Sequence, residues 1–126
     1  MQRVMLKSKI HRATVTDCDL HYVGSVTVDL DLLEAADIAE HEQVQVLDID
    51  NGARLTTYAI AGERGSREVK LNGAAARMAA RGDTVILLTY GSYDEVELAN
   101  HRPRVVHVSR DNRIVTVDHE VATLAS

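Results

Sequence analysis

The sequence predicts a mainly β fold, a small β-barrel with short helical inserts. Three observations in its 126 residues predict this: many short β-compatible runs, two turn signals that each join a pair of runs, and only two short helical stretches. The same hairpins also fit a β-sandwich, so the residues leave that architecture open. The length is typical of a single domain covering residues 1–126.

The first elements lie in the N-terminal third. Residues 3–16 contain short β-compatible runs that carry several basic side chains. Residues 26–30 alternate between apolar and polar types, which is typical of a half-buried strand. Residues 31–40 predict a helix, because apolar side chains recur there at roughly helical spacing and Asp31 is a favoured N-cap residue.

The middle of the chain contains the clearest local signal. Asn51-Gly52 separates an apolar run at 44–50 from another at 53–60. Asn-Gly is typical of a type I′ turn, in which both central residues need a positive φ. We therefore expect a β-hairpin here.

The remaining elements follow in order. Residues 68–71 predict a short strand, and the Ala-rich residues 73–81 predict a short helix that ends at Gly82. Residues 84–90 form a continuous apolar run and predict a buried strand. A second hairpin is expected around Asp111-Asn112.

Composition excludes several classes of function. The net charge of −5 argues against a general phosphate-backbone binder, and four Tyr without Phe or Trp argue against base-stacking modules. The single Cys18 excludes an internal disulfide and Cys-rich zinc motifs, and the six His show no tight ligand spacing. No apolar run approaches the ~18 residues of a membrane span, and no secretory signal is evident. We expect a cytoplasmic protein with no metal, nucleic-acid or membrane partner.

The pair Gly24-Ser25 has two interpretations. On composition alone it is an ordinary turn. The chemical alternative is an N-to-O acyl shift, in which Ser25 Oγ attacks the Gly24 carbonyl and forms an ester. Glycine suits the attacked position because it has no Cβ to block the approach. Elimination of that ester and hydrolysis would leave a pyruvoyl group at the new N-terminus.

The runs around this pair resemble the pyruvoyl-dependent aspartate 1-decarboxylase family. They match in order and spacing over about residues 1–90, and the resemblance is weaker over 91–126. The matching runs are Lys9-Ile10-His11-Arg12, Asp19-Leu20-His21-Tyr22-Val23-Gly24-Ser25, Asn51-Gly52-Ala53-Arg54, Thr57-Tyr58-Ala59-Ile60, Glu63-Arg64-Gly65-Ser66 and Asn72-Gly73-Ala74-Ala75-Ala76.

The resemblance implies a double-psi β-barrel and a homotetramer with active sites between neighbouring subunits. It implies a zymogen that cleaves itself between Gly24 and Ser25 into a β chain of residues 1–24 and an α chain of residues 25–126. The covalent cofactor would be the pyruvoyl group derived from Ser25. Whether a maturation factor assists the cleavage is left open.

The implied activity is a lyase reaction that converts L-aspartate to β-alanine and CO2 for pantothenate and coenzyme A synthesis. The substrate amine would form a Schiff base with the pyruvoyl ketone. Electrons left by the departing α-carboxylate would then be accepted by the conjugated imine and amide.

The resemblance also implies residue roles. Ser25 and Tyr58 would be catalytic, with Tyr58 as proton donor, and Thr57 would assist cleavage at Gly24 and bind substrate. Arg54 would grip a carboxylate through its planar fork. The other substrate-binding positions would be Lys9, Asn72, Gly73, Ala74 and Ala75, with His11 and Tyr22 in supporting positions.

Two alternatives remain. One is a non-processing β-barrel of the same fold that binds a ligand or partner; loss of Ser25, Arg54 or Tyr58 would mark it, and all three are present. The other is a pyruvoyl decarboxylase for another amino acid, and Arg54 and Lys9 favour an acidic substrate.

Overall fold

A computed structural model describes residues 1–119 of the chain, and the strands in this range join in one sheet of order β2-β6-β3-β5-β4-β7-β1-β8-β9. The strands are β1 (Arg3–Thr14), β2 (Asp17–Asp19), β3 (Ser25–Asp29), β4 (Gln43–Asp48), β5 (Arg54–Gly62), β6 (Val69–Asn72), β7 (Thr84–Tyr93), β8 (Arg104–Val108) and β9 (Ile114–Asp118). The helices are α1 (Leu30–Ala35), the 3₁₀ helix η1 (Gly73–Arg77) and α2 (Glu95–Leu98).

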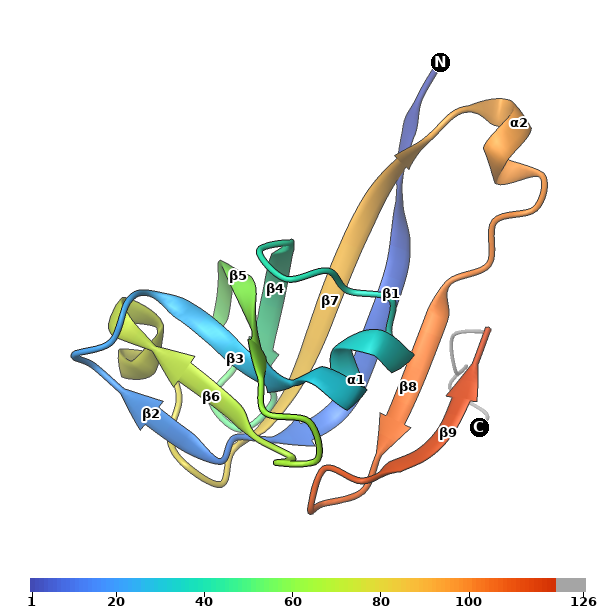
Figure 1. Cartoon of the computed structure of the whole chain (residues 1–126). Coiled ribbons are helices and arrows are strands. Elements are labelled where there is room, and N and C mark those ends of the chain that lie inside the picture. The colour runs from blue at the N-terminus through green and yellow to red at the C-terminus, as the bar shows by residue number, and fades with distance from the viewer. Residues whose placement is uncertain (120–126) are drawn as a thin grey trace.

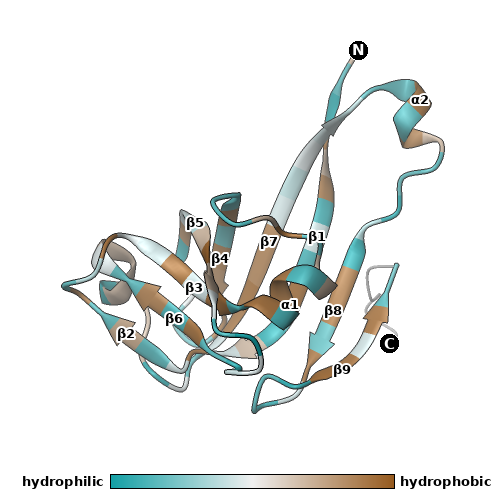
Figure 2. Cartoon of the chain, in the orientation of Figure 1, coloured by the Kyte–Doolittle hydropathy of each residue, from teal (hydrophilic) through white to brown (hydrophobic). Residues whose placement is uncertain are grey.

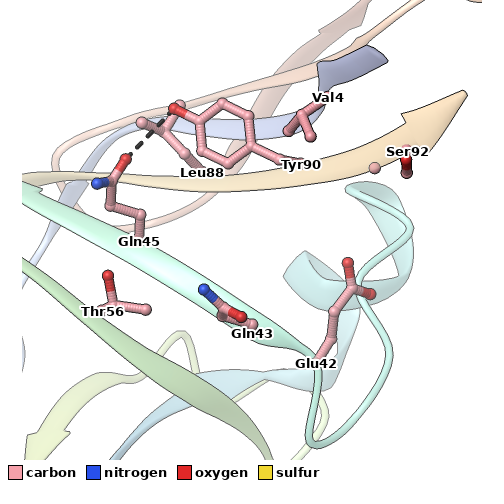
Figure 3. A pocket seen from close by; sticks show the side chains of 9 residues that line it. Val4, Glu42, Gln43, Gln45, Thr56, Leu88, Tyr90 and Ser92 are labelled. Atoms are coloured by element: carbon pink, nitrogen blue, oxygen red, sulfur yellow. Dashed lines mark hydrogen bonds between the residues drawn. The ribbon is translucent and has the colours of Figure 1, made fainter. Parts of the chain in front are cut away.

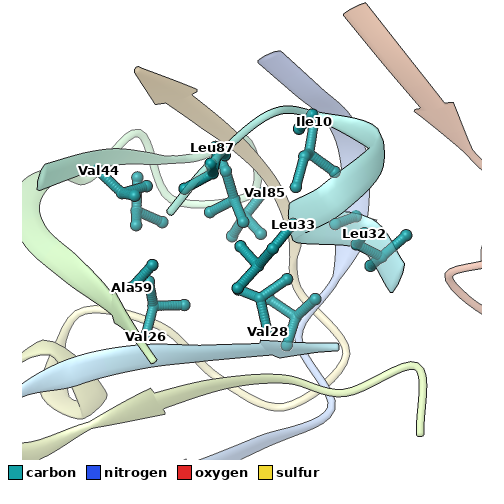
Figure 4. Packing of buried hydrophobic residues seen from close by; sticks show 14 of the residues in the cluster. Ile10, Val26, Val28, Leu32, Leu33, Val44, Ala59, Val85 and Leu87 are labelled. Carbon is teal, nitrogen blue, oxygen red and sulfur yellow. The ribbon is translucent and has the colours of Figure 1, made fainter. Parts of the chain in front are cut away.

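The sheet curls around an aliphatic core (Figure 1). Ile10 of β1, Val28 of β3 and Leu87 of β7 are all fully buried in one cluster, although β3 lies three or more strand steps from the adjacent strands β7 and β1. Helix α1 adds Leu32 and Leu33 to the same cluster (Figure 4). In Figure 2 the hydrophobic colours fall mainly within the strands and α1. The prediction of a mainly β, barrel-like fold with short helices is confirmed.

The longest pairing joins β1 to β7, antiparallel from Arg3↔Tyr93 to Thr14↔Thr84. Two register shifts interrupt it, the second between Ile10 and Ala13. Strand β8 pairs in parallel with the other side of β1. The segment predicted as short runs over 3–16 is therefore one central strand, bent by bulges that let it follow the curved sheet.

The predicted helix at 31–40 is shorter and begins earlier than expected. The N-cap is Asp29, not Asp31, because the Asp29 carboxylate accepts a hydrogen bond from Asp31 N at 2.8 Å. The helix ends at Ala35, and Asp37 follows with a φ of 55°. A positive φ is incompatible with a continuing right-handed helix.

The hairpin at Asn51-Gly52 is confirmed, but its predicted type I′ turn is wrong. Strands β4 and β5 pair as far as Leu47↔Arg54, so a longer loop joins them. Gly52 has a φ of 76°, whereas Asn51 is not among the residues with positive φ. Asp48 shapes this loop, because its side chain accepts hydrogen bonds from Asp50 N and Asn51 N.

The remaining predictions are mostly confirmed. The strands expected at 26–30, 68–71 and 84–90 correspond to β3, β6 and the longer β7, and β8 and β9 form the second hairpin. The predicted helix at 73–81 is instead the short 3₁₀ helix η1, which ends well before Gly82. Helix α2 was not predicted, although Asp94 and Glu97 form a capping box there. Within residues 1–119, no helix combines the length and apolarity needed to cross a membrane.

Candidate functional site

Ser25 is the first residue of β3 and is fully buried. Strand β3 lies between β5 and β6, pairing Ser25 with Asn72 of β6 and Val26 with Ala59 of β5. Val26 and Ala59 point into the core (Figure 4), so the alternating Ser25 lies on the opposite face of the sheet.

Two hydrogen bonds hold the Ser25 hydroxyl. Asn72 Nδ2 donates to Ser25 Oγ at 2.9 Å, and Ser25 Oγ donates to the Val23 carbonyl at 3.1 Å. Asn72 is itself fully buried, and its Oδ1 has no hydrogen-bond partner. A buried amide carbonyl without a partner is costly, and such an atom is a common mark of a functional position.

Gly24 rests directly on Gly73. Gly73 has a φ of 64°, and a Cβ added to it would lie 2.7 Å from Gly24 Cα and 3.0 Å from the Tyr22 carbonyl oxygen. Only glycine permits this approach of two backbones. By contrast, nothing lies within 4 Å of a Cβ added to Gly24 itself, which is exposed. The backbone of Gly24 is therefore in contact with Gly73 on one side, and the space on the side of its missing Cβ is empty.

The loop before Gly24 is also held from β6. The Lys70 ammonium lies 5.2 Å from the centre of the Tyr22 ring, and it pairs with Asp19 at 3.8 Å. Both contacts come from partly exposed groups and are individually weak.

Tyr58 and Thr57 belong to β5, the strand that pairs with β3 on the side away from β6. Continuing the parallel register from Val26↔Ala59 places Tyr58 beside Ser25 and Thr57 beside Gly24. Tyr58 alternates with the core residue Ala59, so it shares the face of Ser25, whereas Thr57 points to the core side. Tyr58 also makes an edge contact with His41 at 6.2 Å between ring centres.

Arg54 lies on the face of Tyr58, four residues earlier in β5, which is about 13 Å along the strand. Its side chain is exposed. Ala74 and Ala75 follow Gly73 in η1, where Ala74 is exposed and Ala75 packs partly against the core. Ala74 and Ala75 thus follow the glycine that contacts Gly24, whereas Arg54 lies farther along β5, and none of the three makes a side-chain hydrogen bond to Ser25.

Lys9 and His11 lie elsewhere. Both belong to β1, which is four strand steps from β3 in the sheet order. They alternate with the core residue Ile10, so they face outward from a different wall of the barrel. Within residues 1–119, no hydrogen bond or ring contact joins either residue to Ser25.

His11 packs against His107 of β8 with 5.5 Å between ring centres, and its buried Nδ1 has no partner. Burial lowers the pKa of His11, and the nearby charges of Lys9, His107 and Arg12 lower it further. Burial and these positive neighbours therefore favour the neutral form of His11.

A second polar cluster lies outside this region. Carboxylate oxygens of Asp48, Asp50 and Asp83 all lie within 4.8 Å of one another. Burial and a hydrogen bond to Asp83 raise the pKa of Asp48 to about 6, while the same contact lowers the pKa of Asp83. The cluster therefore keeps a proton to a higher pH than a free Asp would.

A surface hollow of about 400 Å³ lies elsewhere, over β4, β5 and β7 (Figure 3). Tyr90 crosses it and donates a hydrogen bond to Gln45 Oε1 at 3.3 Å. None of the site residues predicted from the sequence lines this hollow.

Sequence reasoning missed Thr27 and the Val23 carbonyl. Thr27 Oγ1 accepts a second hydrogen bond from Asn72 Nδ2 at 2.9 Å. The alternation of β3 could have indicated Thr27, because a residue two positions after Ser25 shares its face.

Comparison with known proteins agrees with this picture. A family model described as aspartate decarboxylase matches residues 1–115. Over 115 residues the chain is 56% identical to a protein named aspartate 1-decarboxylase from Laribacter hongkongensis (strain HLHK9), covering 91% of each chain. The matched region contains Ser25, Tyr58 and Asn72 together with the strands that position them. The chain belongs to the aspartate decarboxylase family.

Proposed function

We propose that the chain decarboxylates L-aspartate to β-alanine in pantothenate biosynthesis, after cleaving itself between Gly24 and Ser25. The observation that carries the proposal is the buried Ser25 hydroxyl, which Asn72 holds directly after a glycine that rests on Gly73. Membership of the aspartate decarboxylase family supports the reaction class and the substrate.

Self-cleavage uses groups that lie together in one chain. Ser25 Oγ attacks the Gly24 carbonyl carbon, the peptide C–N bond breaks, and the residue-25 amine takes up the hydroxyl proton. Loss of the Ser25 α-proton then expels the Gly24 carboxylate and leaves a carbon–carbon double bond in residue 25. Addition of water and loss of ammonia complete the pyruvoyl group.

Neighbouring residues fit these steps. Asn72 Nδ2 donates to Ser25 Oγ and stabilises negative charge that develops there. Thr57 falls beside Gly24 when the strand register is continued, on the face opposite Ser25, and we assign to its hydroxyl a hydrogen bond to the carbonyl oxygen under attack. The open side of Gly24 leaves room for the tetrahedral centre.

The surroundings of residue 25 also fit a pyruvoyl group. When present, this group accepts the electron pair left by the departing α-carboxylate. Asn72 offers a buried, unpartnered carbonyl and an amide N–H at this position. Tyr58 shares the face of residue 25 and is the proposed proton donor to the former α-carbon, and Arg54, exposed on the same face, is the proposed ligand of the other carboxylate.

The separation of Lys9 and His11 from Ser25 supports an assembly of several chains. In this proposal, β1 of a neighbouring chain covers the Ser25 region of the first and brings Lys9 to it. We therefore propose a homotetramer with sites between subunits, acting in the cytoplasm.

The test is the mass of the denatured protein together with β-alanine formation. We expect two fragments, the larger starting at position 25 and lighter by one ammonia than a chain that starts with serine. Ser25→Ala should abolish both cleavage and turnover, because no other atom can form the ester. Ser66→Ala, which changes an exposed loop serine, is the matched control and should leave both unchanged. Decarboxylation by the intact Ser25→Ala chain would contradict the proposal.

A further inference from the structure

Thr27 is the second hydroxyl bound to Asn72. It follows Ser25 by two residues in β3 and lies on the same face of the strand. Asn72 Nδ2 donates at 2.9 Å to Ser25 Oγ and at 2.9 Å to Thr27 Oγ1. The two hydrogens of one buried amide are thus divided between the nucleophile and a neighbouring threonine.

The donor count fixes the direction of these bonds. The single Ser25 hydroxyl hydrogen is committed to the Val23 carbonyl at 3.1 Å, so Ser25 Oγ must accept from Asn72. The NH2 group of Asn72 must therefore face β3, and its second hydrogen needs an acceptor. Thr27 Oγ1 supplies that acceptor.

Without the Thr27 hydroxyl, the orientation of the amide is no longer fixed. The amide could then turn its carbonyl toward Ser25 Oγ, because Oδ1 has no partner that holds it in place. A carbonyl in that position would draw the Ser25 proton away from Val23, and it could not stabilise negative charge on Oγ.

We propose that Thr27 is a positioning residue for self-cleavage, acting through the amide of Asn72 on the Ser25 hydroxyl. The inference rests on the proposed function, since it concerns the step that matures the enzyme. It assigns to Thr27 the orientation of the amide and no contact with the reacting carbonyl.

The experiment follows cleavage of full-length chains made by cell-free translation, so that time zero is defined. Thr27→Val removes the hydroxyl and keeps the shape, and we expect cleavage to slow about 3- to 10-fold, as loss of one hydrogen bond does. Thr27→Ser keeps the hydroxyl and should retain most of the wild-type rate. Thr116→Val, on the exposed strand β9, is the matched control. The melting temperature of each variant reports any structural effect.

A second comparison separates positioning from packing. In an Asn72→Ala chain the hydroxyl has no amide to orient, so adding Thr27→Val should cause no further slowing. An unchanged rate in Thr27→Val, equal slowing in Thr27→Ser, or additive slowing in the double variant would each overturn the inference. A wild-type chain that stays intact both in cell-free translation and after expression in cells would overturn the proposed function, and this inference with it. Normal wild-type cleavage beside an unaffected Thr27→Val would overturn the inference alone.

Discussion

The region around Ser25 and the region around Lys9 differ in how complete they are within one chain. Asn72 of β6 donates a hydrogen bond to Ser25 of β3, and Gly73 contacts the backbone of Gly24, so these positions are fixed within one chain. Lys9 and His11 lie on β1, and the buried His11 Nδ1 has no partner. The first region contains the groups of the proposed self-cleavage, whereas the proposed role of the second requires a neighbouring chain.

This difference separates maturation from turnover. Cleavage needs groups that one chain brings together, so it should be intrinsic to the folded chain. Decarboxylation of a dianionic substrate needs added positive charge, and we propose that Lys9 of β1 supplies it to a neighbouring chain.

The largest effect on the cleavage rate is expected from adding a methyl group where Gly73 contacts Gly24. Gly73→Ala would place a methyl group 2.7 Å from Gly24 Cα, so the backbone at the cleavage site must move. We expect cleavage to slow by about 100-fold or more, since small misplacements of reacting groups are costly.

Gly82→Ala is the matched control for this change. Gly82 has a φ of 92° and nothing within 4 Å of an added Cβ, so it carries the same kind of backbone strain without the clash. Both variants are followed by the mass of the denatured chain over time. Equal slowing in the two would show that strain alone, and not the contact with Gly24, controls cleavage.

An intermediate effect, a partial recovery of β-alanine formation, is expected from mixing two inactive chains. Ser25→Ala chains lack the pyruvoyl source and Lys9→Ala chains lack the proposed cation. If each site draws Ser25 from one chain and Lys9 from another, co-expressed hybrids should regain roughly a quarter of the wild-type sites. β-Alanine formation by doubly tagged hybrids is the measurement. Hybrids no more active than the better parent would place both residues in one chain.

The smallest effect is expected from Asp48, which belongs to neither region. Because the pKa of Asp48 is raised from 3.8 to about 6, the folded chain keeps a proton on this carboxyl group between these two pH values, whereas the unfolded chain has already released it. Stability should therefore fall as pH rises through that window, by about 1 kcal/mol between pH 5 and pH 8.

Asp48→Asn mimics the protonated acid and should remove this pH dependence. Urea unfolding at the two pH values measures it, in a Ser25→Ala background that keeps the chain intact. Cleavage and turnover of the Asp48→Asn chain with Ser25 present should stay unchanged. A pH dependence that survives the substitution would assign it to other groups.

The elements predicted correctly from the sequence are those set by local pattern. Alternation and apolar runs located β3, β6 and β7, because burial of one or both faces dictates those patterns. The errors arose where a side chain overrides local preference. Asp29 caps α1 while also accepting hydrogen bonds from Gly65 N and Arg67 N, and this second role involves a loop distant in sequence.

The candidate site also has features that the sequence predicted and features that it did not. Its motifs were recognisable in the sequence, and the family was predicted correctly from them. The hydrogen bonds from the Asn72 amide to Ser25 and Thr27 were not predicted, because they depend on the antiparallel register that brings Asn72 opposite Ser25. The distance of Lys9 from that amide depends on strand order, which no local pattern encodes.

The position of β1 between β7 and β8 has a consequence for the processed protein. A cut after Gly24 would leave this central strand on the small fragment, held by hydrogen bonds on both sides rather than by a covalent link. Folding of the intact chain is a first-order process, but reassembly of the two fragments would be second-order. Recovery after denaturation should then depend on protein concentration, and maturation would convert a reversible fold into one preserved mainly by its slow unfolding.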